Sequence, residues 1–133
     1  MKLIVHVDGG SRGNPGPAAA GAVLSTPDGD VVDEATELLG IVSNNVAEYR
    51  ALLLGLQRAR ELGASEVEAI NDSELIAKQV NGQYKDKHPD MKPLHAEAIT
   101  ALKAFDSWTV RTVRREQNAH ADALVNAALD TVR

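Results

Sequence analysis

The sequence predicts one α/β domain, a mixed sheet with helices packed on its faces. Three observations support this class. Short apolar or alternating segments separated by turn residues occupy roughly the first 40 positions, which is typical of a meander of strands. Longer segments with apolar residues at helical spacing follow, and two further short strands lie between them. Strands and helices in this order build a sheet that carries helices on its faces.

The first three predicted strands cover residues 2–8, 19–25 and 30–39. The "TPDG" turn at 26–29 separates the second strand from the third. The glycine-rich stretch between the first two strands is longer than a tight hairpin requires. It predicts a loop whose glycines allow something bulky to approach the backbone beside Asp8.

The rest of the chain is predicted to be mainly helical. A long helix is expected from about Ser43, a capping residue, to Gly63, a stop residue. The remaining predicted elements are a strand at 65–72, a helix at 73–82, a polar linker at 83–93, a helix at 94–105, a strand at 108–114 and a helix at 118–132.

The composition restricts the class of protein. The chain has 133 residues, 44% of them hydrophobic and 25% charged, as expected for one globular domain. Without cysteine, neither disulfides nor thiolate metal sites are possible, so oxygen ligands and a hard cation such as Mg²⁺ are favoured. The apolar N-terminal stretch is too short for a signal peptide, and no transmembrane segment is found. We therefore expect a cytoplasmic protein with no membrane partner.

The net charge of −5 argues against a nucleic-acid partner, because such domains are usually basic. The basic residues are nevertheless unevenly placed, and a run of charges is most often just a solvated face. They gather in two stretches: Lys78, Lys85, Lys87 and Lys92, and then Arg111, Arg114 and Arg115.

Four acidic residues occupy positions where acids are not expected. Asp8 and Asp72 end the first and fourth predicted strands, and ligands collect at strand ends in open α/β sheets. Glu48 and Asp122 each lead an apolar stripe near the start of a helix. Each residue alone is explained by a turn or by the helix dipole. If all four converge, their repulsion disfavours the metal-free site, and a bound divalent metal would account for them.

The motifs "VDGGSRGNPGPAAAGAV", "SNNVAEYRALLLGL", "NDSELIAKQVNG" and "RREQNAHADALVNAAL" together resemble type 1 ribonuclease H, from Leu3 to about Ala128. The resemblance implies the ribonuclease H-like fold, a five-stranded mixed sheet whose first three strands are antiparallel, with helices on both faces. It implies hydrolysis of the RNA strand of RNA/DNA hybrids, leaving 3′-hydroxyl and 5′-phosphate ends. It also implies two Mg²⁺ ions, with Mn²⁺ as a substitute, held by Asp8, Glu48, Asp72 and Asp122. Two such ions would activate water and stabilise the leaving oxygen.

The resemblance also implies contacts to the hybrid, with the glycines letting the RNA sugar edge approach. The 2′-hydroxyl at that edge distinguishes RNA from DNA. Glu74 stands where the family often has glutamine. The implied substrate contacts are Gly9, Gly10, Ser11, Asn14, Ser43, Asn44, Asn45 and Glu74.

Two features depart from the family pattern. The basic, tryptophan-rich protrusion of many bacterial members is replaced by the short "YKDKHPDMKPLH", which predicts weaker hybrid binding. The catalytic-loop histidine is missing, since His120 is expected on a different face of the last helix. Arg115 is therefore the candidate to assist product release, as an arginine does in members with shorter loops.

Alternative functions stay open at this point. The chain could be a hybrid-binding module of the same fold without activity, although its four acids are intact. It could be a nuclease or integrase of the same fold that acts on DNA, but those lack this glycine-asparagine loop and the "SNN" helix start. It could also be a structural domain whose acids are merely solvated. We expect a monomeric single domain over 1–133, or one domain of a longer protein.

Overall fold

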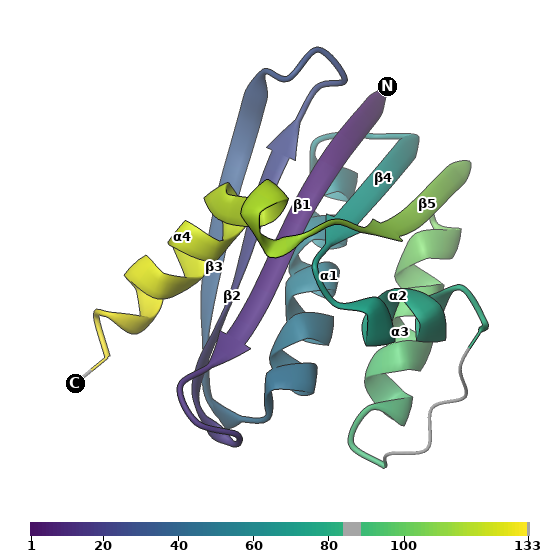
Figure 1. Ribbon diagram of the computed structural model, residues 1–133. Coiled ribbons are helices and arrows are strands. Elements are labelled where there is room, and N and C mark those ends of the chain that lie inside the picture. Colours follow the sequence, from purple (N-terminus) through teal and green to yellow (C-terminus); the bar gives the residue numbers. More distant parts are fainter. Residues whose placement is uncertain (84–88, 133) are drawn as a thin grey trace.

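The computed structural model describes residues 1–83 and 89–132 and contains a five-stranded mixed sheet (Figure 1). The strand order is β3-β2-β1-β4-β5, with β1, β2 and β3 antiparallel and with β4 and β5 parallel to β1. This is the sheet that the sequence predicts. The strands are β1 (Lys2–Ser11), β2 (Gly16–Ser25), β3 (Val31–Val42), β4 (Glu66–Asn71) and β5 (Ser107–Thr112).

Helices cover both faces of the sheet. In Figure 1, α4 crosses in front of β2 and β3, whereas α1 lies behind the sheet, and α1 also packs against α3. The main core lies between β1 and α1, where Val5 and Val7 meet Leu52 and Leu56. The helical elements are α1 (Asn44–Glu61), α2 (Glu74–Val80), α3 (Lys92–Lys103), the 3₁₀ turn η1 (Arg115–Asn118) and α4 (Ala119–Leu129).

The long helix α1 has the ends that the sequence predicts. The Ser43 hydroxyl accepts a hydrogen bond of 3.2 Å from the Val46 amide and so caps the first turn. At the other end Gly63 has a φ of +84°, a conformation that strongly favours glycine. Both ends therefore follow from local chemistry.

The predicted glycine-rich loop is wrong. β1 continues three residues past Asp8, with Gly9 paired to Ala20 and Ser11 paired to Ala18, so only residues 12–15 turn. A β-carbon on Gly9 would lie 2.1 Å from the Ala47 carbonyl oxygen. Gly9 is thus required for the close approach of α1 to β1. This requirement comes from tertiary packing and cannot be recognised from the sequence of the strand.

Other boundaries shift by a few residues. β3 extends to Val42 past Gly40, and the helix expected over 118–132 is α4 at Ala119–Leu129, preceded by η1. Lys85 and Lys87 lie outside the described residues. No helix in the described parts of the chain is long and apolar enough to cross a membrane.

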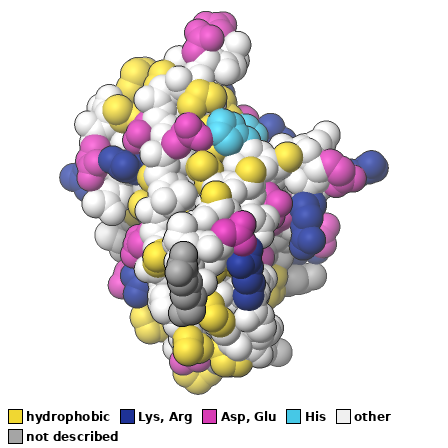
Figure 2. Space-filling view, turned by 90° about the vertical axis from the view of Figure 1, so that its left-hand side faces the viewer, with side chains coloured by type: hydrophobic (Ala, Val, Ile, Leu, Met, Phe, Trp, Pro, Cys, Tyr) yellow, Lys and Arg dark blue, Asp and Glu magenta, His cyan; other side chains and the backbone are white. Residues whose placement is uncertain are grey.

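The outer face over β3 and α4 carries both signs of charge. Figure 2 shows acidic and basic side chains mixed with small apolar areas on this side of the molecule. Across it, Arg12 of the β1–β2 turn pairs with Asp130 after α4 at 2.6 Å. Charge of either sign is therefore not concentrated on the part of this face that is described.

Candidate active site

Four acidic side chains from different parts of the fold line one pocket at the end of β4. Asp8 lies in β1 and Asp72 directly follows β4, and the parallel register of these strands brings the two residues side by side. Glu48 lies just beyond the first turn of α1, near the start of the helix as expected, and Asp122 lies in the first turn of α4. All four line a pocket of about 150 Å³.

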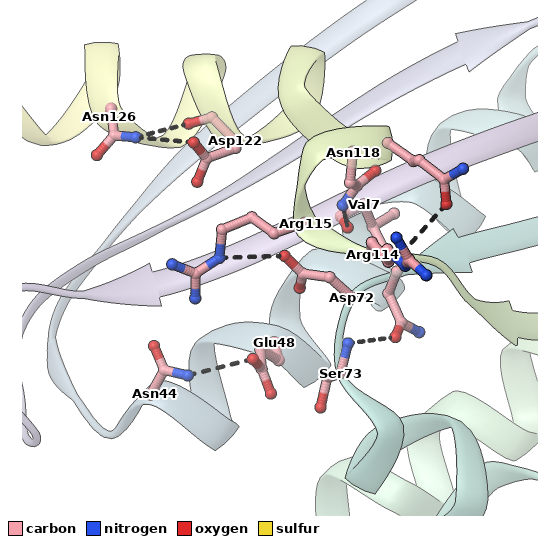
Figure 3. Close-up of polar contacts among 12 residues, drawn as sticks. Val7, Asn44, Glu48, Asp72, Ser73, Arg114, Arg115, Asn118, Asp122 and Asn126 are labelled. Atoms are coloured by element: carbon pink, nitrogen blue, oxygen red, sulfur yellow. Dashed lines mark hydrogen bonds and ion pairs between the residues drawn. The ribbon is translucent and has the colours of Figure 1, made fainter.

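Neighbouring side chains hold three of these acids in place (Figure 3). Asn44 donates a hydrogen bond of 3.1 Å from Nδ2 to Glu48 Oε1, one turn along α1. Asn126 likewise donates from Nδ2 to Asp122 Oδ2 at 3.3 Å. These amides orient the carboxylates without neutralising their charge.

Arg115 approaches the third acid from η1, and Figure 3 shows its side chain reaching towards Asp72. The distance from Arg115 Nε to Asp72 Oδ2 is 3.9 Å, and the arginine side chain is 84% exposed. A long, solvated ion pair of this kind contributes little to stability. The guanidinium is therefore free to move to another anion.

The pocket disfavours the accumulated negative charge. Asp8 is only 8% exposed, and burial, together with the nearby Asp72 and Asp122 carboxylates, raises its pKa to about 8. Burial also raises the pKa of Glu48, although hydrogen bonds from Ser73 and Asn44 oppose the shift. Without a cation, the pocket thus favours a protonated Asp8 at neutral pH.

The donor set of this pocket fits a hard divalent cation, since all four acids offer oxygen and a cation would relieve their repulsion. Within residues 1–83 and 89–132, however, no three His, Asp or Glu side chains form a ready-made metal site. Asp122 is already within hydrogen-bonding reach of Asp8. Glu48 and Asp72 are held by Asn44 and Arg115, respectively.

The predicted substrate contacts fall into three places. Gly9, Gly10, Ser11 and Asn44 line the carboxylate pocket, and the Ser11 amide donates to Asn44 Oδ1 at 3.3 Å. Asn14, Ser43 and Asn45 instead line a neighbouring groove. Glu74 lies apart from both, where it is exposed and pairs with Lys78.

His120 points away from the carboxylate pocket. Its Nε2 lies 2.6 Å from Glu34 Oε2 on β3, on the outer face of the sheet. The different orientation that the sequence predicts for His120 is therefore confirmed. Two basic residues, Arg115 and Arg12, line the carboxylate pocket.

Sequence reasoning missed Asn118, which is 1% exposed. Its Nδ2 donates a hydrogen bond of 2.8 Å to the Val7 carbonyl, next to Asp8 in the chain. The contact joins residues far apart in sequence, so no local sequence pattern predicts it. It ties η1, which carries Arg115 and leads into α4 with Asp122, to the strand that carries Asp8.

A sheet of this order, with acids gathered where β1 and β4 lie side by side, defines the ribonuclease H-like class of α/β proteins. A family model described as "Reverse transcriptase-like" matches residues 6–128. The ribonuclease HI of Halobacterium salinarum is 43% identical over 129 residues, which cover 97% of this chain and 65% of that protein. The bifunctional protein Rv2228c of Mycobacterium tuberculosis is 44% identical over 131 residues, covering 98% of this chain and 36% of that protein.

Solved structures agree with these relatives. The crystal structure of Halobacterium salinarum RNase H1 has a TM-score of 0.97 at 41% identity, covering 99% of this chain and all of that one. LC11-RNase H1, solved in complex with an RNA/DNA hybrid, has a TM-score of 0.92 at 39% identity and 97% coverage of both chains. The chain belongs to the type 1 ribonuclease H family. It spans about a third of the mycobacterial relative and less than two thirds of the halobacterial one.

Proposed function

We propose that this protein hydrolyses the RNA strand of RNA/DNA hybrids at the carboxylate pocket, leaving 3′-hydroxyl and 5′-phosphate ends. The observation that carries the proposal is the convergence of Asp8, Glu48, Asp72 and Asp122 on one pocket, in a chain of the type 1 ribonuclease H family. Relatives named ribonuclease H, and a neighbour bound to a hybrid, support the substrate class. All four acids come from one chain, so a monomer suffices.

The four carboxylates would hold two Mg²⁺ ions, or Mn²⁺ in their place. Asp8 is the most buried of the four and contacts the others electrostatically, so it would be the shared ligand. Divalent ions, when bound, supply a nucleophilic water at neutral pH and stabilise the leaving oxygen. Asn44 and Asn126 would hold the Glu48 and Asp122 carboxylates in orientation beside the ions.

The small residues beside the acids would admit the RNA sugar. A β-carbon added to Gly10 would meet nothing closer than 3.7 Å, so this part of β1 is open towards the pocket. Gly10, Ser11 and Asn44 together present backbone and amide groups that can hydrogen-bond a 2′-hydroxyl. Duplex DNA lacks that hydroxyl and would lose those contacts.

Arg115 would serve the reacting phosphate. Its weak pairing with Asp72 leaves the guanidinium available for a phosphate oxygen, which it can bind with two parallel hydrogen bonds. Such a contact would hold the scissile phosphate and, after cleavage, help the 5′-phosphate product to leave.

The test is cleavage of an RNA/DNA hybrid whose RNA strand is labelled, with Mg²⁺ and with excess EDTA. Duplex DNA and duplex RNA of the same sequence are the matched substrates, and Asp8→Asn is the matched enzyme control. We expect Mg²⁺-dependent cutting of the hybrid RNA alone, with 3′-hydroxyl and 5′-phosphate ends, and no cutting by Asp8→Asn. Tight binding of the hybrid without cleavage would indicate an inactive binding module, and equal cutting of duplex DNA would indicate a general nuclease.

A further inference from the structure

A second hollow lies on the outer face of the sheet, between the start of α4 and the β2–β3 turn. We call it the β2–α4 hollow, and it has a volume of about 380 Å³. In Figure 1 the β2–β3 turn lies above η1 and the start of α4, and residues of these segments form its sides. Figure 2 shows histidine at the surface of this side, with apolar side chains next to it. The volume lies within the range of small-molecule sites, about 300–1,000 Å³.

The floor of the hollow comes from two paired strands. Ile4 of β1 pairs with Ser25 of β2, and His6 pairs with Val23. Alternation along β1 places Ile4 and His6 on the same face of the sheet as Asp8. The hollow therefore opens on the strand face that carries Asp8, closer to the start of β1.

The lining of the hollow offers no free charge to a ligand. Among the residues that the structure describes, no Asp, Glu, Lys or Arg lines it. Burial and the nearby Arg111 lower the pKa of His6, so its ring is uncharged at neutral pH. His120, at the wall, is already paired with Glu34, its Nε2 lying 2.6 Å from Oε2. An uncharged ligand is favoured, because a charged one would lose water without gaining a partner of opposite charge.

The wall of the hollow presents hydrogen-bond acceptors. Asn118 donates from Nδ2 to the Val7 carbonyl, but its buried Oδ1 has no partner in the part of the chain that the structure describes. Buried carbonyl oxygens are nearly always hydrogen-bonded, so this one calls for a donor. His120 donates from Nε2 to Glu34, since a carboxylate only accepts, and its neutral ring then leaves Nδ1 as a second acceptor.

We propose that the β2–α4 hollow binds a small, uncharged aromatic molecule that carries an N–H or O–H donor. The flat ring would lie on Ile4 and Val23, and its donor would satisfy Asn118 Oδ1, with His120 Nδ1 as the second acceptor. Burial of the apolar ring would supply most of the affinity. The single donor would fix the orientation of the ring.

This site is separate from the carboxylate pocket. The two have no lining residue in common. Gln117 and Ala121 at the wall of the hollow nevertheless belong to the same η1–α4 segment that carries Arg115 and Asp122. Binding in the hollow does not rest on the proposed function, and it can be measured without a nucleic acid.

The first experiment uses indole as the probe and benzofuran as its control. The two molecules have the same shape, but benzofuran has an oxygen acceptor in place of the N–H donor. A ligand this small is expected to bind with a Kd of about 1 mM, so binding is followed by the amide chemical shifts in NMR titrations of the whole chain. We expect saturable shifts at His6, Val23 and Ala121, and about tenfold tighter binding of indole than of benzofuran. Equal affinities, or no saturable shift at these residues, would overturn the inference.

The second experiment blocks the hollow. Val31 lines it and is 49% exposed, whereas the adjacent Val32 is 48% exposed and does not line it. Both lie in β3, so Val31→Trp and Val32→Trp place the same side chain on opposite faces of one strand. We expect Val31→Trp to weaken indole binding at least about tenfold and Val32→Trp to bind like the wild type.

Urea unfolding of both tryptophan variants verifies that each remains folded. Loss of indole binding in both variants, or in neither, would contradict the assigned site. Both experiments use the protein alone, so their outcome does not depend on whether it cleaves hybrids. A wild type that binds indole in the hollow but cuts no hybrid would reject only the proposed function.

Discussion

Replacement of Asp8 by asparagine tests whether the four acids repel one another in the metal-free pocket. Asparagine keeps the shape of the side chain but removes its charge. In the metal-free protein, burial and neighbouring carboxylates raise the pKa of Asp8 from 3.8 to about 8. Between these values the folded state retains a proton that the unfolded chain has released. The stability of the wild type should therefore fall as the pH rises from about 4 to about 8.

The size of the effect follows from the same shift. Each pKa unit corresponds to about 1.4 kcal/mol, so the full shift sets an upper limit of about 6 kcal/mol above pH 8. Water entering the pocket and rotation of the carboxylates reduce this penalty, since the effective dielectric constant of such sites is near 20. We expect Asp8→Asn to be more stable than the wild type in EDTA at pH 8 by about 1–3 kcal/mol. At pH 4 the difference should vanish.

Mg²⁺ should make the wild type more stable than Asp8→Asn. A ligand bound only by the folded state stabilises it by about 2.7 kcal/mol at a hundredfold excess over Kd. The wild type should gain on this scale and Asp8→Asn should gain much less. Urea unfolding of both proteins at pH 4, 6 and 8, with EDTA and with Mg²⁺, measures how pH and the metal change the free energy of unfolding. Glu97→Gln, on the exposed face of α3, controls for the removal of one acid from an acidic chain.

An Asp8→Asn protein that is less stable than the wild type in EDTA at pH 8 would refute this reasoning. It would mean that Asp8 stabilises the fold and that the acids do not repel one another strongly. Equal stabilisation of both proteins by Mg²⁺ would refute the assignment of Asp8 as a metal ligand.

Four further outcomes are expected. Ca²⁺ should inhibit Mg²⁺-supported cleavage in a competition assay, because its larger size and looser coordination suit the reaction poorly. Arg115→Ala should lower kcat by about tenfold to a hundredfold while hybrid Kd, measured by titration, changes little; an equal loss of affinity would make Arg115 a simple phosphate contact. Gly9→Ala should destabilise the protein by about 3 kcal/mol in urea unfolding, since its β-carbon would meet the Ala47 carbonyl at 2.1 Å. Gly10→Ala should stay within about 1 kcal/mol of the wild type, because its β-carbon has space, yet it should lower hybrid cleavage.

The sequence predicts the sheet from local rules, whereas the meeting of the four acids was implied by the family resemblance. Alternation of residues identifies each strand, and parallel strands bring their carboxyl ends to the same edge. Asp8 and Asp72 lie side by side because β1 and β4 are adjacent and parallel in this register, although β1 continues to Ser11. The apolar stripes of α1 and α4 likewise fixed the sheet-facing sides of those helices, and Glu48 and Asp122 followed from them.

The hairpin between β1 and β2 could not be predicted in the same way. Glycine and alanine have low strand propensity, so residues 9–11 and 16–18 were expected to form a loop. They are extended because α1 and α4 press on the two sides of this hairpin, where larger side chains would clash. A β-carbon on Gly9 would meet α1, and one on Gly21 would lie 3.1 Å from the Ala121 carbonyl of α4. The choice of residue reflects contacts made far along the chain.

Asn118 shows how the two halves of the pocket are joined without a metal. Asp8 and Asp122 repel each other, so their proximity must be enforced by other contacts. The buried amide of Asn118 binds the Val7 carbonyl, while Val125 on α4 packs against Ala19 of β2. The polar contact of Asn118 and the apolar contact of Val125 thus hold α4 against the sheet before and after Asp122 in the chain. These packing contacts offset the repulsion between the acids, and a bound cation would relieve part of that repulsion.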